Sequence, residues 1–187
     1  GASLSKAVLE RADLRHSNLE NTNLRGADLS FADLEGANLL NARLETANLT
    51  GANLHAARLD SAHLHRVRAN RAHFDQASLT NADLRELDGY DARFVEANLE
   101  GASLTEAKLE QADLRRANLQ RSDFTRARMT RVRLEGANLE GASLVKAQMD
   151  QASLIDADLR NADLTGANLS QSDLTGSNLT DTLLGNV

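Results

Sequence analysis

Leucine occupies most positions of a strict five-residue series that runs from Leu4 to Leu184 in this 187-residue chain. These two residues are 180 positions apart, so the series has 37 central positions, and no insertion interrupts it. Leu fills 30 of the centres, and the residue two positions before each centre is Ala, Ser, Thr or Val except at Leu87. The other seven centres are Ala69, Phe74, Gly89, Phe94, Phe124, Met129 and Met149.

A period of five matches neither regular secondary structure. On an α-helix each step of five residues advances about 500°, so the leucines would drift around the helix. On a flat strand an odd step would place successive leucines on opposite faces. They can all point to one interior only if the chain turns once per repeat. A fixed repeat of this kind is typical of a solenoid.

The irregular centres indicate how many repeats complete one turn. Three pairs of unusual centres are 20 residues apart, namely Ala69 and Gly89, Phe74 and Phe94, and Met129 and Met149. Twenty residues are four repeats, so we predict that the members of each pair stack on one side of a four-sided coil. A three-sided coil would place Ala69 over Leu84 and lose these coincidences.

The substitutions near these centres also compensate each other in volume. Where the centres shrink to Ala69 and Gly89, the residues two positions earlier grow to Val67 and Leu87. Protein interiors are close-packed, so an exchange of this kind is expected inside a core. We therefore place both positions of each repeat in the interior.

Tandem Ala-(Asp/Asn)-Leu-X-X units resemble the pentapeptide-repeat proteins, and the resemblance covers the chain from Ala2 to Leu184. It implies an all-β fold, a right-handed quadrilateral β-helix with four five-residue sides per coil. About nine coils at a strand spacing of about 4.8 Å would form a rod roughly 45 Å long. We expect residues 1–187 to be a single β-helix domain. The chain lacks an N-terminal Met and opens inside a repeat, so we interpret it as excised from a longer protein.

Composition narrows the chemistry that is open to the chain. The absence of Cys excludes disulfides, Cys-ligated zinc and thiol catalysis, and the absence of Pro suits a ladder of backbone donors. Glycines such as Gly26 fall mostly at the last position of a repeat, which is consistent with corners. No membrane span or signal peptide is present, which favours the cytoplasm. Bare coil ends also predict end-to-end self-association.

A 20-residue period sorts the exterior into four sides, which we number from the repeats centred on Leu4, Leu9, Leu14 and Leu19. The first side carries 7 basic and 6 acidic residues and the second 6 of each, whereas the third carries 5 and 9 and the fourth 3 and 6. The third and fourth sides therefore hold the excess negative charge. The residue before the centre on the fourth side is mostly Asn, which predicts amide hydrogen bonds from coil to coil.

The most distinctive surface patch lies on the second side around the two undersized centres. It consists of Arg68, Arg71, Asp88, Tyr90 and Asp91. Tyr90 is the only Tyr of the chain, and we expect it to be exposed. A local packing irregularity with ordinary surface charge is the favoured interpretation. The alternative is a protein-interaction patch, because an aromatic residue between arginines is typical of interfaces.

No group of residues predicts catalysis, a cofactor site or a metal site. His63 and His65 flank Leu64 and point outward, and surface histidines are favoured over a metal site because no third ligand is evident. No buried carboxylate pair, Ser-His-Asp triad or phosphate loop is apparent, so we expect no enzyme. The arginines of residues 115–133 spread over all four sides among acidic residues and without aromatic residues. We therefore expect no direct binding to nucleic acid.

Two functions remain as hypotheses. The first is a non-enzymatic scaffold, a rigid rod that presents flat faces to a protein partner or spaces the domains of a larger protein. The second is implied by the resemblance alone, since some pentapeptide-repeat proteins are DNA mimics that bind DNA gyrase or topoisomerase IV and confer quinolone or toxin resistance. Those members favour Phe centres with Cys two positions earlier, projecting loops and a C-terminal dimerisation helix. This chain has Leu centres and Ala two positions earlier, so the scaffold is the favoured hypothesis and DNA gyrase the alternative partner.

Overall fold

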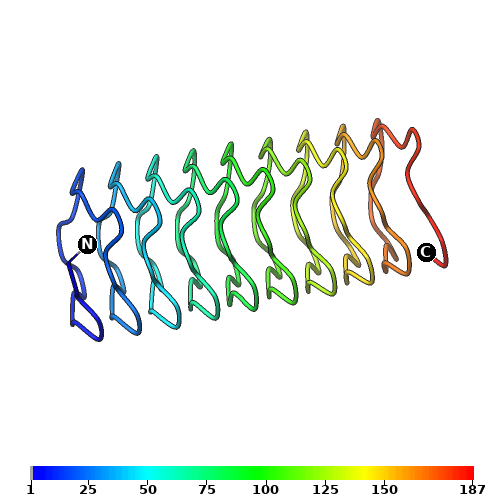
Figure 1. Ribbon diagram of the computed structural model, residues 1–187. Helices are drawn as coiled ribbons and strands as arrows, with labels where there is room; N and C mark the ends of the chain where they lie inside the picture. Colours follow the sequence, from blue (N-terminus) through cyan, green and yellow to red (C-terminus); the bar gives the residue numbers. More distant parts are fainter. Residues whose placement is uncertain (1) are drawn as a thin grey trace.

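The protein is a solenoid in which the chain winds along one axis, from the blue N-terminal end to the red C-terminal end in Figure 1. The computed structural model describes residues 2–187. Parallel bridges join the residue before each centre to the residue 20 positions later, from Ser3 with Asn23 to Asp163 with Leu183. One turn of the solenoid therefore takes 20 residues, or four repeats, as the irregular centres predicted. These are isolated bridges, and no helix is present within residues 2–187.

Backbone hydrogen bonds hold adjacent turns together at three positions of each repeat. Around Leu24, the amides of Asn23, Leu24 and Gly26 donate to carbonyls of neighbouring turns at 2.7–3.0 Å. The amide of Thr22 donates to the carbonyl of Leu19 across the corner at 3.1 Å. Four of the five amides in a repeat thus have backbone partners, and only the amide that follows the centre lacks one.

The Asp or Asn before the centre satisfies this fifth amide. The Oδ1 atom of Asn23, for example, accepts from the amide of Arg25 at 3.2 Å. The same bond forms at 19 of the 20 repeats with Asp or Asn before the centre. A side-chain oxygen two residues back is the usual partner in an Asx turn. The repeat therefore needs Ala and Leu for the interior and Asp or Asn for its remaining donor.

The twentieth such repeat uses a substitute from the preceding turn. The amide of Tyr90 donates no bond to Asp88 and donates instead to Oδ1 of Asn70 at 2.9 Å. Asp75 serves the amide of Val95 in the same way at 2.9 Å, because Arg93 stands where Asp or Asn is usual. A side chain one turn away can thus replace the local one.

Each corner has the left-handed backbone conformation at the second residue after the centre. Among residues 2–187 there are 37 such corners, with Gly at only 8 of them and φ of 53–62° at the other 29. The amide of the next residue donates back to the carbonyl of the centre, as in a type II turn. A side chain in this conformation costs roughly 1–2 kcal/mol, so the corners store strain that the ladder offsets. The sequence predicted the Gly corners but not this majority of other residues.

The interior is filled by the residues that the period predicted. Away from the first and last turns, the centres and the small residues two positions earlier are fully or almost fully buried. The rings of Phe74 and Phe94 stack with their centroids 4.7 Å apart. A Cβ atom added to Gly89 would lie 3.2 Å from the Leu87 side chain, so Leu87 occupies the volume that a central Leu would take. The predicted stacking and volume exchange are both confirmed.

Candidate functional site

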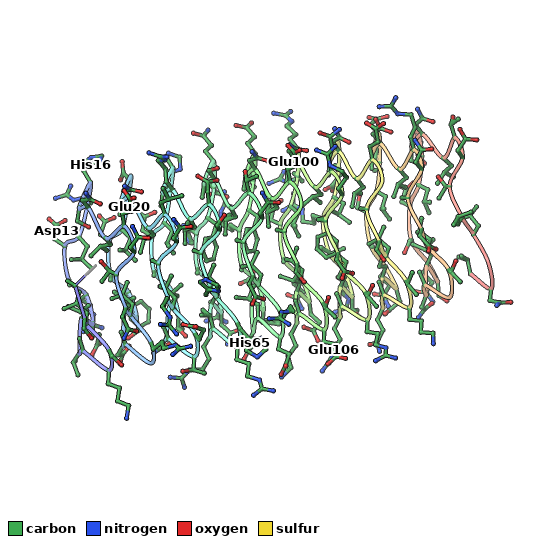
Figure 2. All side chains as sticks on the ribbon, in the orientation of Figure 1. Asp13, His16, Glu20, His65, Glu100 and Glu106 are labelled. Atoms are coloured by element: carbon green, nitrogen blue, oxygen red, sulfur yellow. The ribbon has the colours of Figure 1, made fainter. Side chains whose placement is uncertain are left out.

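The exterior is a set of flat sides on which polar side chains are paired along the axis. Figure 2 shows the side chains projecting from the edges of the stack, with Glu100 on one edge and His65 and Glu106 on the opposite edge. Many acidic residues contact an arginine of their own or an adjacent turn. At Asp13, hydrogen bonds from Arg15 lower the pKa to about 2. Most charge on the surface is therefore compensated locally.

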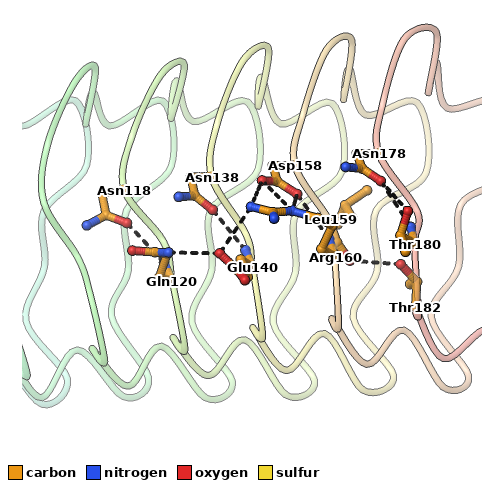
Figure 3. A network of polar contacts seen from close by, with 10 residues as sticks. All are labelled: Asn118, Gln120, Asn138, Glu140, Asp158, Leu159, Arg160, Asn178, Thr180 and Thr182. Atoms are coloured by element: carbon orange, nitrogen blue, oxygen red, sulfur yellow. Dashed lines mark hydrogen bonds and ion pairs between the residues drawn. The ribbon is translucent and has the colours of Figure 1, made fainter.

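The fourth side carries the predicted Asn ladder in two places only. The Nδ2 atom of Asn38 donates to Asn18 at 3.3 Å, and that of Asn118 donates to Asn98 at 3.0 Å. Elsewhere each Asn mainly accepts from its own turn, as Figure 3 shows for Asn138 and the amide of Glu140, 3.1 Å apart.

The longest run of contacts on this side passes through Glu140, which connects three turns. Its Oε2 atom accepts from Gln120 at 3.1 Å and from Arg160 at 3.2 Å (Figure 3). Arg160 also donates to Asp158 at 2.7 Å, and this bond lowers the pKa of Asp158. These residues satisfy one another, so the network fixes the surface and presents few unpaired groups.

The arginines between residues 115 and 133 are engaged in the same manner. Six of the seven lie within 4.0 Å of a carboxylate, and Arg131 donates to Gln151 at 2.9 Å. Guanidinium groups that are already paired are poor ligands for a phosphate backbone. That this belt does not bind nucleic acid stays a prediction.

Asp113 on the third side is buried, whereas the other acidic side chains of residues 2–187 are partly or fully exposed. Its side chain is 7% exposed, with Arg115 at 2.7 Å and Arg133 at 3.4 Å. Burial raises the pKa of Asp113, but hydrogen bonds from Arg115 hold it below its usual value. A shallow depression of about 330 Å³ adjoins this pair and is lined by Val95, Arg115, Arg116 and Glu135.

The histidines form no metal site. His63 and His65 lie on the first side, and Nε2 of His65 is 3.7 Å from Glu86. Within residues 2–187, no group of three His, Asp or Glu side chains could hold a metal ion. Over the same residues, no helix is long and apolar enough to cross a membrane.

The predicted patch on the second side spans two adjacent turns. Tyr90 is 40% exposed, and its carbonyl accepts from the amide of Arg71 at 2.9 Å. The Nε atom of Arg71 is 3.6 Å from Asp91. Arg68 and Asp88 face each other as bridge partners, yet no ion pair within 4.0 Å joins them. The structure thus brings the five predicted residues together around the packing exchange at Gly89.

Phe31 belongs to the same side and was missed by the sequence analysis. It stands at a corner with φ 56° and is 54% exposed. Its ring lies over Gly51, where an added Cβ atom would be 2.7 Å from two ring carbons. The guanidinium carbon of Arg11 is 5.6 Å from the ring centroid on the other side. Two sequence signals could have revealed this exposed ring, namely a Phe at the last position of a repeat and a Gly 20 residues later.

Exposed apolar side chains gather on the second side. Among residues 2–187, seven large apolar side chains expose 37% or more of their surface, and four of these belong to residues 179–187. The other three are Val8, Phe31 and Tyr90. All three occupy the second side, which makes it the candidate interaction surface.

Family models match most of the chain. The model for a pentapeptide repeat region matches residues 67–144, and the model for pentapeptide repeats in eight copies matches residues 1–30, 27–66, 133–171 and 142–181. The chain belongs to the pentapeptide-repeat family. The fold of this pentapeptide-repeat protein is accordingly a right-handed β-helix.

Solved structures of pentapeptide-repeat proteins resemble the chain over nearly its whole length. One is HetL, involved in heterocyst differentiation regulation in the cyanobacterium Nostoc sp. strain PCC 7120, with 35% identity, a TM-score of 0.58, and 97% of this chain and 84% of HetL covered. Another is QnrB1, a plasmid-mediated fluoroquinolone resistance protein in trypsin-treated form, with 20% identity, a TM-score of 0.56, and 99% and 90% covered. At 20% identity the second similarity concerns the fold alone. A comparison with curated protein sequences gave no match.

Proposed function

We propose that this protein is a non-enzymatic scaffold, a four-sided rigid rod that presents its second side to a protein partner. Spacing the domains of a longer protein is compatible with the same rod. The observation that supports the proposal is that Val8, Phe31 and Tyr90, the exposed large apolar side chains outside residues 179–187 of the described chain, all lie on one side. Exposed aromatic residues beside arginines are enriched where proteins bind each other. The interaction patch is therefore Arg68, Arg71, Asp88, Tyr90 and Asp91. End-to-end association remains a prediction.

The repeat itself provides four equivalent positions with which to test the proposal. Arg58, His63, Arg68 and His73 stand before successive centres, so each lies exposed on a different side. A photo-crosslinking amino acid placed at each position in turn, in the cells of origin, should give one defined protein adduct from position 68. The same adducts from all four positions, or no protein adduct from any, would contradict the proposal.

DNA mimicry remains the alternative, and charge density separates it from the scaffold. Nine turns that each rise about 4.8 Å give the rod a length of roughly 43 Å, and duplex DNA of this length carries about 25 negative charges. The net charge of this chain is −6, and arginines contact many of its carboxylates. A supercoiling assay with purified DNA gyrase should therefore show no inhibition or protection at micromolar protein. Inhibition at that concentration would support the alternative instead.

A further inference from the structure

We propose that the second side binds an extended acidic segment of the partner protein. In this proposal Phe31 and Tyr90 receive apolar side chains of the segment, and Arg68 and Arg71 receive a carboxylate between them. The inference rests on the proposed function, and it adds the chemistry of the partner and a second anchor.

Phe31 is held in place before any partner binds. Its ring packs against Gly51, and the absence of a Cβ atom there leaves room for two ring carbons. Arg11 covers part of the ring from the preceding turn at 5.6 Å. An aromatic side chain fixed in this way loses little conformational entropy on binding. Its corner conformation, with φ 56°, is unfavourable for a bulky residue.

Two backbone hydrogen bonds fix Tyr90 to the preceding turn. Its amide donates to Asn70 at 2.9 Å, and its carbonyl accepts from the amide of Arg71 at 2.9 Å. The side chain is 40% exposed and stands next to Gly89, whose missing side chain is replaced in the core by Leu87. The exchange of Leu87 and Gly89 keeps the core filled beneath an outward-facing Tyr.

The two repeats between these anchors are basic, although the repeat of Tyr90 itself carries Asp88 and Asp91. On the second side, the intervening repeats 47–51 and 67–71 contain two arginines and no Asp or Glu. Within residues 2–187, no carboxylate lies within 4.0 Å of Arg68, and Arg71 has only Asp91 at 3.6 Å. The nearest acidic residue toward Phe31 on this side is Asp28, which accepts from Ser30 at 2.7 Å and from Asn48 at 2.9 Å. Among these residues the guanidinium of Arg68 thus has no carboxylate within 4.0 Å and is open to one from outside, whereas Arg71 would exchange its contact with Asp91 for it.

The separation of the anchors sets the spacing of the segment. Phe31 and Tyr90 are 59 residues apart, or about three turns of the solenoid. Three turns rise about 14 Å, and an extended chain covers this distance in about four residues at about 3.4 Å each. The expected segment therefore carries apolar side chains at positions i and i+4, with Asp or Glu between them. It lies on the second side, parallel to the axis of the solenoid.

A random 12-residue peptide library displayed on phage and selected on the whole immobilised chain tests this inference. The selected peptides should share two apolar residues at positions i and i+4, with Asp or Glu between them. Synthetic copies should bind in the micromolar range, and Phe31→Asn, Tyr90→Ala and Arg71→Glu should each weaken binding at least 10-fold. Asn tolerates the corner conformation well, so Phe31→Asn removes the anchor without threatening the fold.

Arg126→Glu is the matched control for Arg71→Glu. Both arginines occupy corners, with φ of 58° and 57°, and both have a carboxylate of an adjacent turn at 3.5–3.6 Å. Arg126 lies on the first side, so its substitution should leave peptide binding unchanged. The inference is overturned if no shared spacing emerges, or if the control weakens binding as much as Arg71→Glu. Either result would leave the scaffold proposal standing if crosslinking at position 68 still identifies a partner.

Discussion

The aromatic rings of Phe74 and Phe94 lie 4.7 Å apart and within 2° of parallel, although 20 residues separate them. Aromatic pairs contribute about 0.5–1.5 kcal/mol beyond the area that they bury. We expect Phe74→Leu and Phe94→Leu each to lower the free energy of unfolding by about 1–2 kcal/mol. A double-mutant cycle in urea should give a coupling energy of about 0.5–1.5 kcal/mol. Additive losses would mean that the two rings do not interact.

The exchange between Leu87 and Gly89 predicts that two destabilising substitutions cancel. Gly89→Leu should cost about 1–3 kcal/mol because its side chain would meet Leu87 and Leu109. Leu87→Ala should cost about 2–5 kcal/mol because it leaves a cavity. The double variant restores the usual repeat, so its urea midpoint should return close to that of the parent. A double variant less stable than both single variants would contradict this account of the core.

We expect Asn70 to contribute more to stability than Asp88, although Asp88 is the residue that stands before the centre. Asp88 occupies the position that normally serves the amide of Tyr90, yet Asn70 accepts that bond at 2.9 Å. Asn70→Ala should therefore cost about 1 kcal/mol, comparable to the loss of a helix cap. Asp88→Ala should change stability by less than about 0.5 kcal/mol. Thermal melts of the two variants test this expectation. A larger loss of stability for Asp88→Ala than for Asn70→Ala would refute Asn70 as the partner of the Tyr90 amide.

The lowered pKa of Asp113 predicts how the stability of the protein depends on pH. Its pKa in the folded protein is below the usual value of 3.8, so the unfolded chain binds the proton more readily. Its contribution is therefore present above about pH 4 and is lost as the pH falls through the lower, folded value. Asp83, Asp123 and Asp158 have lowered pKa values as well and act in the same direction.

Melting temperatures at pH 7, 4, 3 and 2 test this expectation. Asp113→Asn should melt a few degrees lower at pH 7 and lose less between pH 4 and pH 2 than the parent does. Asp91→Asn is a useful control because Asp91 is exposed and its contact with Arg71 is 3.6 Å long. If the melting temperatures of the parent and of Asp113→Asn fell by the same amount between pH 4 and pH 2, Asp113 would have no part in acid unfolding.

The sequence predicted the features that follow from the period. The 20-residue register, the burial of the centres and the stacking of Phe74 on Phe94 all depend on a strict pattern of apolar residues, which can be counted directly. The exchange of volume between Leu87 and Gly89 could be predicted for the same reason, since close packing links neighbouring positions.

Other features depend on which rotamers the exterior side chains adopt. Asp113 is buried because Arg115 and Arg133 both fold over it, and the sequence shows only three charged residues among many. Phe31 stands at a corner position that polar residues and glycine usually occupy, so the five-residue pattern gives no indication of its exposure. The left-handed conformation at most corners was missed because backbone hydrogen bonds override the preference of residues such as Arg126.

The pairing of each residue with one 20 positions later has a consequence for changes in chain length. Adding 20 residues between Phe31 and Tyr90 would lengthen the solenoid by one turn and leave both aromatics on the same side. Adding a single five-residue repeat would satisfy the core equally well but would shift every later residue to the next side. Small insertions could thus reorient whole surfaces without redesign of the interior, so the relative direction of two binding surfaces can change independently of their composition.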